Sequence, residues 1–196
     1  MRACLFALVA AAGFAFGANE SAALLSGASD MLDKRSVTTG RFTQTATVAA
    51  LSAPLVSSGS FYFDRARGVS WHVEQPISAQ FVFLPTTDGA PAARGQVQMS
   101  WVGQLLNTVL AGDLSALSRM FLVDGSLSPD GWALVLAPKS TAVARAIAKI
   151  DVDGGTAIHR IKLLEANGDD ITIVFSEVQH PASLPADVDR EFEQAH

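Results

Sequence analysis

The residues whose types and spacing could do chemistry lie in the segment 59–76, where large apolar residues alternate with polar ones on both sides of a short basic turn. Strand side chains point alternately to opposite faces, so this pattern predicts a β-hairpin with one apolar face. Arg65 shares the face of Phe61 and Phe63 and therefore ends an aromatic wall. The second strand adds Val69, Trp71 and Val73 to one face. This surface is suited to binding an apolar ligand, with a guanidinium group at its edge that can donate hydrogen bonds.

Catalytic and metal-binding patterns are weak in this chain. The four histidines, His72, His159, His180 and His196, lack the His-Glu-x-x-His spacing of a zinc site. The sequence has no Gly-x-Ser-x-Gly elbow and no glycine-rich phosphate loop followed by Lys and Ser or Thr. Residues 151–154 resemble the opening of a calcium loop, but the later ligands and the bidentate glutamate are missing. We therefore expect a protein that is not an enzyme and that carries no metal or cofactor.

Length and composition predict one secreted domain. The chain has 196 residues, of which 49% are hydrophobic, enough for a sizeable core. Residues 1–17 have the pattern of a signal peptide: Arg2 precedes an uncharged apolar run that is shorter than the about 20 residues of a transmembrane helix. Cleavage before Ala18 would leave a single domain at 18–196 and remove Cys4, the only cysteine. The net charge of −5 disfavours nucleic acids and anionic membrane surfaces as partners.

The apolar spacing predicts a first helix at 21–35 and a helical segment at 101–121, broken at Gly112 and Asp113, where Asp113 can cap a second short helix. Strands are expected at 37–48, 77–84, 132–136, 158–165 and 171–175, besides the hairpin, with turns at 126–131, 153–155 and 167–168. The period of residues 143–152 fits a helix or a strand. Residues 85–95 are expected to form a loop, and no element is predicted for the acidic tail around Pro181 and Pro185.

These elements predict an α+β protein, mainly β, with a strongly curved antiparallel sheet or incomplete barrel and helices over its open face. If the helices form a movable lid, the space beneath them is a ligand cavity. If they are fixed, the hairpin aromatics belong to a sealed core. The sequence leaves both interpretations open.

Several segments, taken in order, resemble one known family, the periplasmic outer-membrane lipoprotein carriers called LolA. The segments that carry the resemblance are residues 37–44, 58–65, 71–76, 134–139, 155–159 and 171–175. They span most of the chain after residue 17. Two features depart from the family pattern: residues 90–95 stand where an aromatic-rich strand is usual, and the C-terminal tail is short.

The resemblance implies a half-open antiparallel barrel closed by a helical lid, located in the periplasm. Its cargo would be acylated lipoproteins or lipids, received from an inner-membrane transporter and passed to an outer-membrane receptor, and we expect the carrier to be a monomer. By position in the family pattern, Arg65 would bind the lid backbone when the cavity is empty. The residues implied to line the cavity are Leu32 from the lid helix and Phe42, Phe61, Phe63, Val69, Trp71 and Val73 from the sheet. A carrier of a free lipid and an enzyme or accessory protein on the same scaffold are the alternatives.

Overall fold

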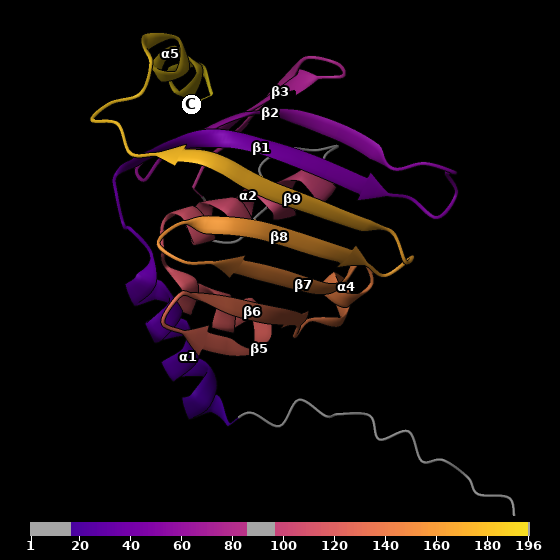
Figure 1. Cartoon of the computed structure of the whole chain (residues 1–196). Helices are drawn as coiled ribbons and strands as arrows, with labels where there is room; N and C mark the ends of the chain where they lie inside the picture. The colour runs from indigo at the N-terminus through magenta and orange to yellow at the C-terminus, as the bar shows by residue number, and fades with distance from the viewer. Residues whose placement is uncertain (1–16, 86–96, 196) are drawn as a thin grey trace, which may run out of the picture.

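One open antiparallel sheet of nine strands dominates the structure, in the order β4-β3-β2-β1-β9-β8-β7-β6-β5 (Figure 1). The computed structural model describes residues 17–85 and 97–195. The strands are β1 (Val37–Thr47), β2 (Leu55–Asp64), β3 (Gly68–Gln75), β4 (Ala79–Phe83), β5 (Phe121–Ser128), β6 (Gly131–Pro138), β7 (Ile147–Gly154), β8 (Ile158–Glu165) and β9 (Asp170–Gln179). β1 pairs with both β2 and β9, so the N-terminal and C-terminal parts of the chain join at the centre of the sheet.

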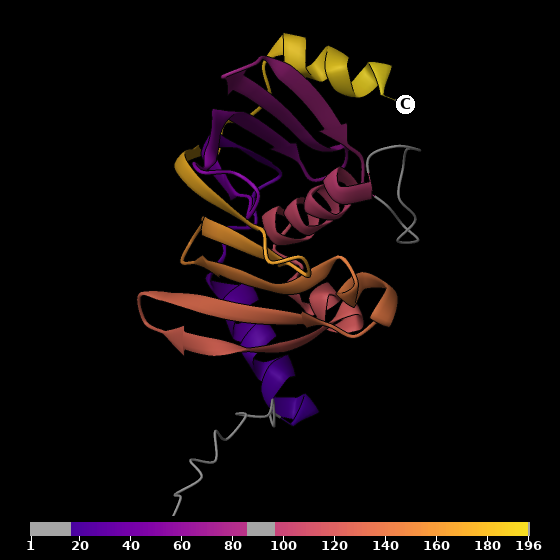
Figure 2. The same cartoon turned by 90° about the vertical axis from the view of Figure 1, so that its right-hand side faces the viewer.

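The helices lie on both faces of this sheet. They are α1 (Ala18–Met31), α2 (Val97–Leu110), the 3₁₀ turn η1 (Leu114–Ala116), α3 (Leu117–Met120), α4 (Thr141–Ala144) and α5 (Ala186–Gln194). α1 packs against β5 and β6, and α2 packs against β3 and β4. Figure 2 shows α2 inside the curve of the sheet and α5 on the opposite side of the β2–β3 end. We call the face covered by α1, α2, η1 and α3 the inner face, these helices the lid, and the opposite face the outer face.

The main core lies between the lid and the inner face. Burial alternates along the strands, as in β6, where Trp132, Leu134 and Leu136 are buried while Ala133 is exposed. This alternation places one apolar side chain in every two on the inner face. Leu25 and Ala28 of α1 belong to the same cluster. The main core therefore runs continuously across the inner face and is covered by the lid.

The predicted fold class is confirmed: the protein is mainly β, its sheet is open, and it carries a few helices, four of which cover the inner face. The predicted hairpin is also confirmed, with β2 and β3 joined by the short turn at 65–67. Residues 143–152, whose period fitted a helix or a strand, contain parts of both, because α4 ends at Ala144 and β7 begins at Ile147. The predicted loop at 85–95 lies outside the described residues except for Pro85. The predicted signal peptide at 1–17 also lies outside them except for Gly17.

Four predictions about local structure were wrong. The first helix covers 18–31 rather than 21–35, because the backbone is extended at Leu32 (ψ 136°). Residues 126–128 continue β5 by pairing with β6, and the turn is confined to Pro129 and Asp130. The helical segment ends at Met120 rather than at residue 121. Its predicted break is confirmed, with Asp113 as the N-cap residue of η1, but the Asp113 side chain accepts a hydrogen bond from the Ser115 hydroxyl (2.6 Å) and none from a backbone N–H of that turn. The tail forms α5.

Candidate functional site

An aromatic wall lies at the β1–β3 end of the inner face. The rings of Phe42 and Trp71 stack with their centroids 3.7 Å apart, and Phe61 meets Phe175 edge to face at 5.4 Å. These side chains share the face because Phe61 lies opposite Trp71 in the β2–β3 register. Aromatic pairs of this kind present a large apolar surface at little cost in conformational freedom.

Gly40 makes room for this wall. It lies opposite Phe61 in the register of β1 and β2, and a Cβ atom at this position would be 2.6 Å from the Phe61 ring. The missing side chain allows the ring of Phe61 to approach the backbone of β1 closely. Gly40 is therefore required by close packing on the inner face.

Six of the residues expected to line a cavity are near one another on the strands of the aromatic wall. Phe42, Phe61, Phe63, Val69 and Trp71 are at most 3% exposed, and Val73 is half-buried against the same core. The seventh, Leu32, lies just beyond α1 and is also half-buried against this core. Leu32 borders a cavity of about 20 Å³ together with Val109, Ile158 and His180. In this closed arrangement the lid covers the apolar wall.

The lid side of the core is supplied mainly by α2. Its buried residues are Leu105, Leu106, Val109 and Leu110, and Leu114 and Leu117 follow from η1 and α3. α2 approaches β4 closely at Gly103, where a Cβ atom would be 2.3 Å from the ring of Phe83. Asn107 also donates a side-chain hydrogen bond to the Phe83 carbonyl oxygen (3.1 Å). The closed lid is therefore fitted to the edge of the sheet.

The segment that ends α2 is hydrogen-bonded to the β2–β3 turn and to α1. Arg65 lies in the β2–β3 turn, beyond the strand on which it was predicted, and its Nη1 donates to the carbonyl oxygen of Ala111 (2.8 Å). The hydroxyl of Ser29 on α1 donates to the next carbonyl, that of Gly112. Carbonyl groups at a helix C-terminus lack partners within the helix, and a cation there is stabilised by the helix dipole. We call the Arg65–Ala111 hydrogen bond the latch.

On the outer face, α5 contacts a hydroxyl and an imidazole of β3. Glu191 Oε2 accepts a hydrogen bond from the Ser70 hydroxyl (2.6 Å) and lies 2.9 Å from His72 Nε2. In a hydrolytic triad the imidazole lies between the acid and the hydroxyl and contacts each through a different nitrogen. Here one carboxylate oxygen contacts both groups, so the cluster binds α5 to the sheet. No group of histidine, cysteine, aspartate or glutamate side chains in the described part of the chain could hold a metal ion.

The sequence interpretation missed two parts of this arrangement. The tail carries a usable signal, because Leu184, Val188 and Phe192 follow each other at intervals of four and are all buried. Ser29 has no comparable signal, since a serine on a helix surface does not reveal which carbonyl group it meets.

The fold and the site together define a class of protein: an open antiparallel sheet with an aromatic inner face, closed by helices that are hydrogen-bonded at their edge. The family model described as outer membrane lipoprotein carrier protein LolA matches residues 33–188. The chain belongs to this family. None of the helices in the part of the chain that the structure describes is long and apolar enough to cross a membrane.

Solved structures give further similarities. A LolA superfamily protein from Nitrosomonas europaea is 10% identical with a TM-score of 0.46, the match covering 86% of this chain and 96% of that one. A putative outer membrane lipoprotein-sorting protein domain from Vibrio parahaemolyticus is 7% identical with a TM-score of 0.47, covering 91% and 98%. The MucA/MucB complex of Pseudomonas aeruginosa matches at 11% identity with a TM-score of 0.45, covering 86% and 60%. A search of curated proteins gave no match.

Proposed function

We propose that this protein is a periplasmic carrier that shields the acyl chains of lipoproteins during their transfer from the inner to the outer membrane. The observation that carries the proposal is the aromatic inner face, which is covered by helices rather than by a second sheet. Helices can move away from a sheet as a unit. A second sheet would be connected to the first one through its edge strands and turns, and it could not move away as easily. The family to which the chain belongs is described as a lipoprotein carrier, which supports the same function.

Cargo binding requires the lid to move. Phe61 and Val69 are 0% exposed, so an acyl chain can contact them only after the lid helices have shifted. A pocket that holds a long acyl chain needs a volume of roughly 300 Å³ or more. The residues that would line the opened pocket are Leu32, Phe42, Phe61, Phe63, Val69, Trp71 and Val73.

The latch supplies a state that competes with cargo. Burial of about fifteen methylene groups contributes roughly 12 kcal/mol before the costs of association, so passive release into water would be slow. In the closed state the lid residues cover the aromatic wall themselves, and Arg65 stabilises this state through Ala111. Closure therefore offsets part of the gain from cargo burial and favours release.

The remaining parts of the proposal concern location and partners. The protein would cross the inner membrane by means of a cleaved signal peptide at 1–17 and work as a monomer without a cofactor or a catalytic step. An inner-membrane transporter would donate the lipoprotein and an outer-membrane receptor would accept it. The excess of acidic residues supports a carrier that does not bind anionic membrane surfaces or nucleic acids.

Photocrosslinking in living cells tests the proposal. A benzophenone amino acid replaces Trp71 on the inner face, and the captured species are analysed by mass spectrometry. Val174 is the matched control, because it is a 47% exposed residue of the neighbouring sheet region, between the buried Ile173 and Phe175. Acylated proteins captured at position 71 but not at 174 would support the proposal. Free lipid without protein would replace it with the free-lipid carrier, and capture of neither would contradict both.

A further inference from the structure

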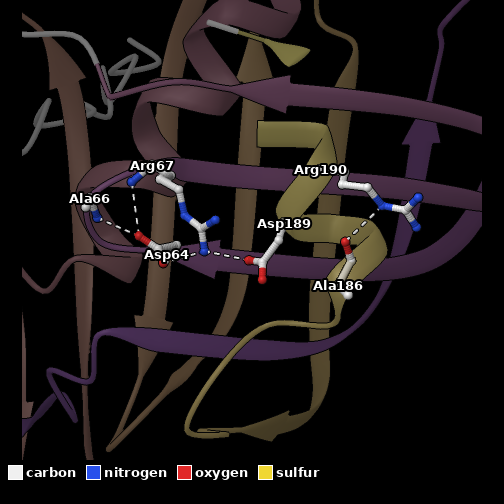
Figure 3. A network of polar contacts seen from close by, with 6 residues as sticks. All are labelled: Asp64, Ala66, Arg67, Ala186, Asp189 and Arg190. Carbon is white, nitrogen blue, oxygen red and sulfur yellow. Dashed lines mark hydrogen bonds and ion pairs between the residues drawn. The ribbon is translucent and has the colours of Figure 1, made fainter. Parts of the chain in front are cut away.

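The β2–β3 turn connects the lid on one side with α5 on the other. Its two arginines have partners on different elements. Arg65 donates to Ala111 at the end of α2. Arg67 Nη2 lies 2.8 Å from Asp189 Oδ1 of α5 (Figure 3). The contact with Asp189 is an ion pair rather than an aligned hydrogen bond. The two arginines are separated by a single residue, so both side chains project from the same three-residue turn.

Asp64 fixes the shape of this turn. Its Oδ1 accepts hydrogen bonds from the backbone N–H groups of Ala66 (2.9 Å) and Arg67 (3.1 Å), and its Oδ2 accepts one from Arg67 Nη2 (2.9 Å) (Figure 3). Burial raises the pKa of Asp64, but the hydrogen bonds from Arg67 and the backbone outweigh burial, and the net pKa is lowered. The same guanidinium nitrogen thus contacts Asp64 and Asp189.

The turn has little freedom to adjust by itself. Gly68 has φ +110°, and a Cβ atom there would be 2.0 Å from the carbonyl oxygen of Phe83. The backbone N–H of Arg65 donates to the carbonyl of Ser36, which precedes β1 (2.9 Å). The backbone from which the Arg65 side chain projects is therefore held in place on both sides.

α5 is firmly placed on the outer face. Phe192 and Val188 are at most 1% exposed and pack with Tyr62 and Val82 in a second, smaller core. The guanidinium carbon of Arg67 lies 5.1 Å from the centre of the Phe192 ring, a cation–π distance. Asp189 is thus presented to Arg67 by a helix with its own apolar anchor.

We propose that α5 sets the strength of the lid latch, with Asp189 as a positioning residue for Arg65 through Arg67 and Asp64. Docked α5 holds the turn in the conformation that aims Arg65 at Ala111. Displacement of α5 from the outer face weakens the latch on the inner face and favours the open, cargo-binding state. This inference rests on the proposed function for its consequence, but the coupling between the two faces is a property of the turn.

A double-mutant cycle tests the coupling. The variants of the chain from Ala18 onward are Asp189→Asn, Arg65→Ala and both together, and the probe is a dansylated long-chain fatty acid. Asp187→Asn is the matched control, because Asp187 is an exposed carboxylate on the same helix. If Asp189 acts through Arg65, D189N tightens probe binding by about threefold, a part of the effect of a charge-assisted hydrogen bond, and adds nothing in the R65A background.

Amide hydrogen exchange provides a second measurement that needs no ligand. The N–H groups of Gly112 and Asp113 close the end of α2 next to the latch. These amides should exchange faster in D189N and in R65A than in the wild type. The double variant should exchange no faster than R65A, and the α5 amides should remain protected in all variants. Any of three results would overturn the inference: equal effects of D187N and D189N, additive effects of R65A and D189N, or unchanged amide exchange at residues 112–113 in D189N. A wild-type protein that binds no fatty acid would contradict the proposed function alone, and exchange would still decide the coupling.

Discussion

Replacement of Arg65 by alanine is expected to tighten the binding of an acyl chain. The bond that is lost runs from a cationic donor to an unpaired carbonyl oxygen at a helix C-terminus, at 2.8 Å. A cation at an exposed helix C-terminus contributes up to about 1 kcal/mol, which is less than a more buried hydrogen bond to a charged group contributes, so we take about 1 kcal/mol for this bond. If the closed state predominates in the empty protein, destabilising it by about 1 kcal/mol relative to the open state tightens apparent cargo binding about fivefold.

The assay is a fluorescence titration with the dansylated fatty acid, followed by stopped-flow measurement of its release into excess vesicles. R65A should bind the probe about fivefold more tightly and release it more slowly, while R65K should fall between R65A and the wild type, because lysine keeps the charge but not the planar donor geometry. Arg145→Ala is the control, since Arg145 is an exposed arginine at the end of α4, outside the lid. Unchanged or weaker binding by R65A would refute the latch.

Three further predictions concern the wall and the turn. Trp71→Glu should abolish fatty acid binding while the circular dichroism spectrum is retained, whereas Val174→Glu should leave binding intact; global unfolding of W71E would instead indicate a sealed core. Gly40→Ala should lower the free energy of unfolding in urea by about 1–3 kcal/mol, because the new methyl group would overlap the Phe61 ring, and a smaller loss would show that the ring can move aside. The lowered pKa of Asp64, whose ordinary value is 3.8, means that this carboxylate adds stability above about pH 4 and loses it as the pH falls through its folded-state pKa. Asp64→Asn should therefore flatten the dependence of unfolding free energy on pH between about 2 and 5, and an unchanged slope would contradict this.

Much of the sheet could be predicted from the sequence because strand burial depends on a short period. The alternation at Phe61 and Phe63, and again at Val69 and Trp71, is confirmed as an apolar inner face. The turns at 65–67 and around Gly168 were equally readable, since they depend on a few local residues. Boundaries were less accurate where a local signal was weak, as at the end of α1.

The missing helix shows a different limit. Residues 184–192 have a clear interval of four between apolar side chains, but the prolines and acidic residues around them favour an unstructured tail. α5 is stable because Val188 and Phe192 are buried on the outer face of the sheet. Isolated helices of this length are marginal in water, so tertiary packing outweighed local propensity.

The sequence by itself determined the class of fold and the chemistry of the wall. Alternation with period two specifies a sheet with an aromatic face, and the ordered segments from residue 37 to residue 175 specify the family resemblance. Both depend on residues that are close together in the chain or that keep a fixed order.

Only the tertiary structure decided which groups meet across long distances in the chain. Arg65 reaches Ala111, 46 residues away, and Ser70 meets Glu191, 121 residues away. Such contacts depend on how the helices close over the sheet, where small shifts change the partner of a side chain. A guanidinium group at a turn satisfies its hydrogen bonds equally well with water, so its type and position alone do not reveal its partner.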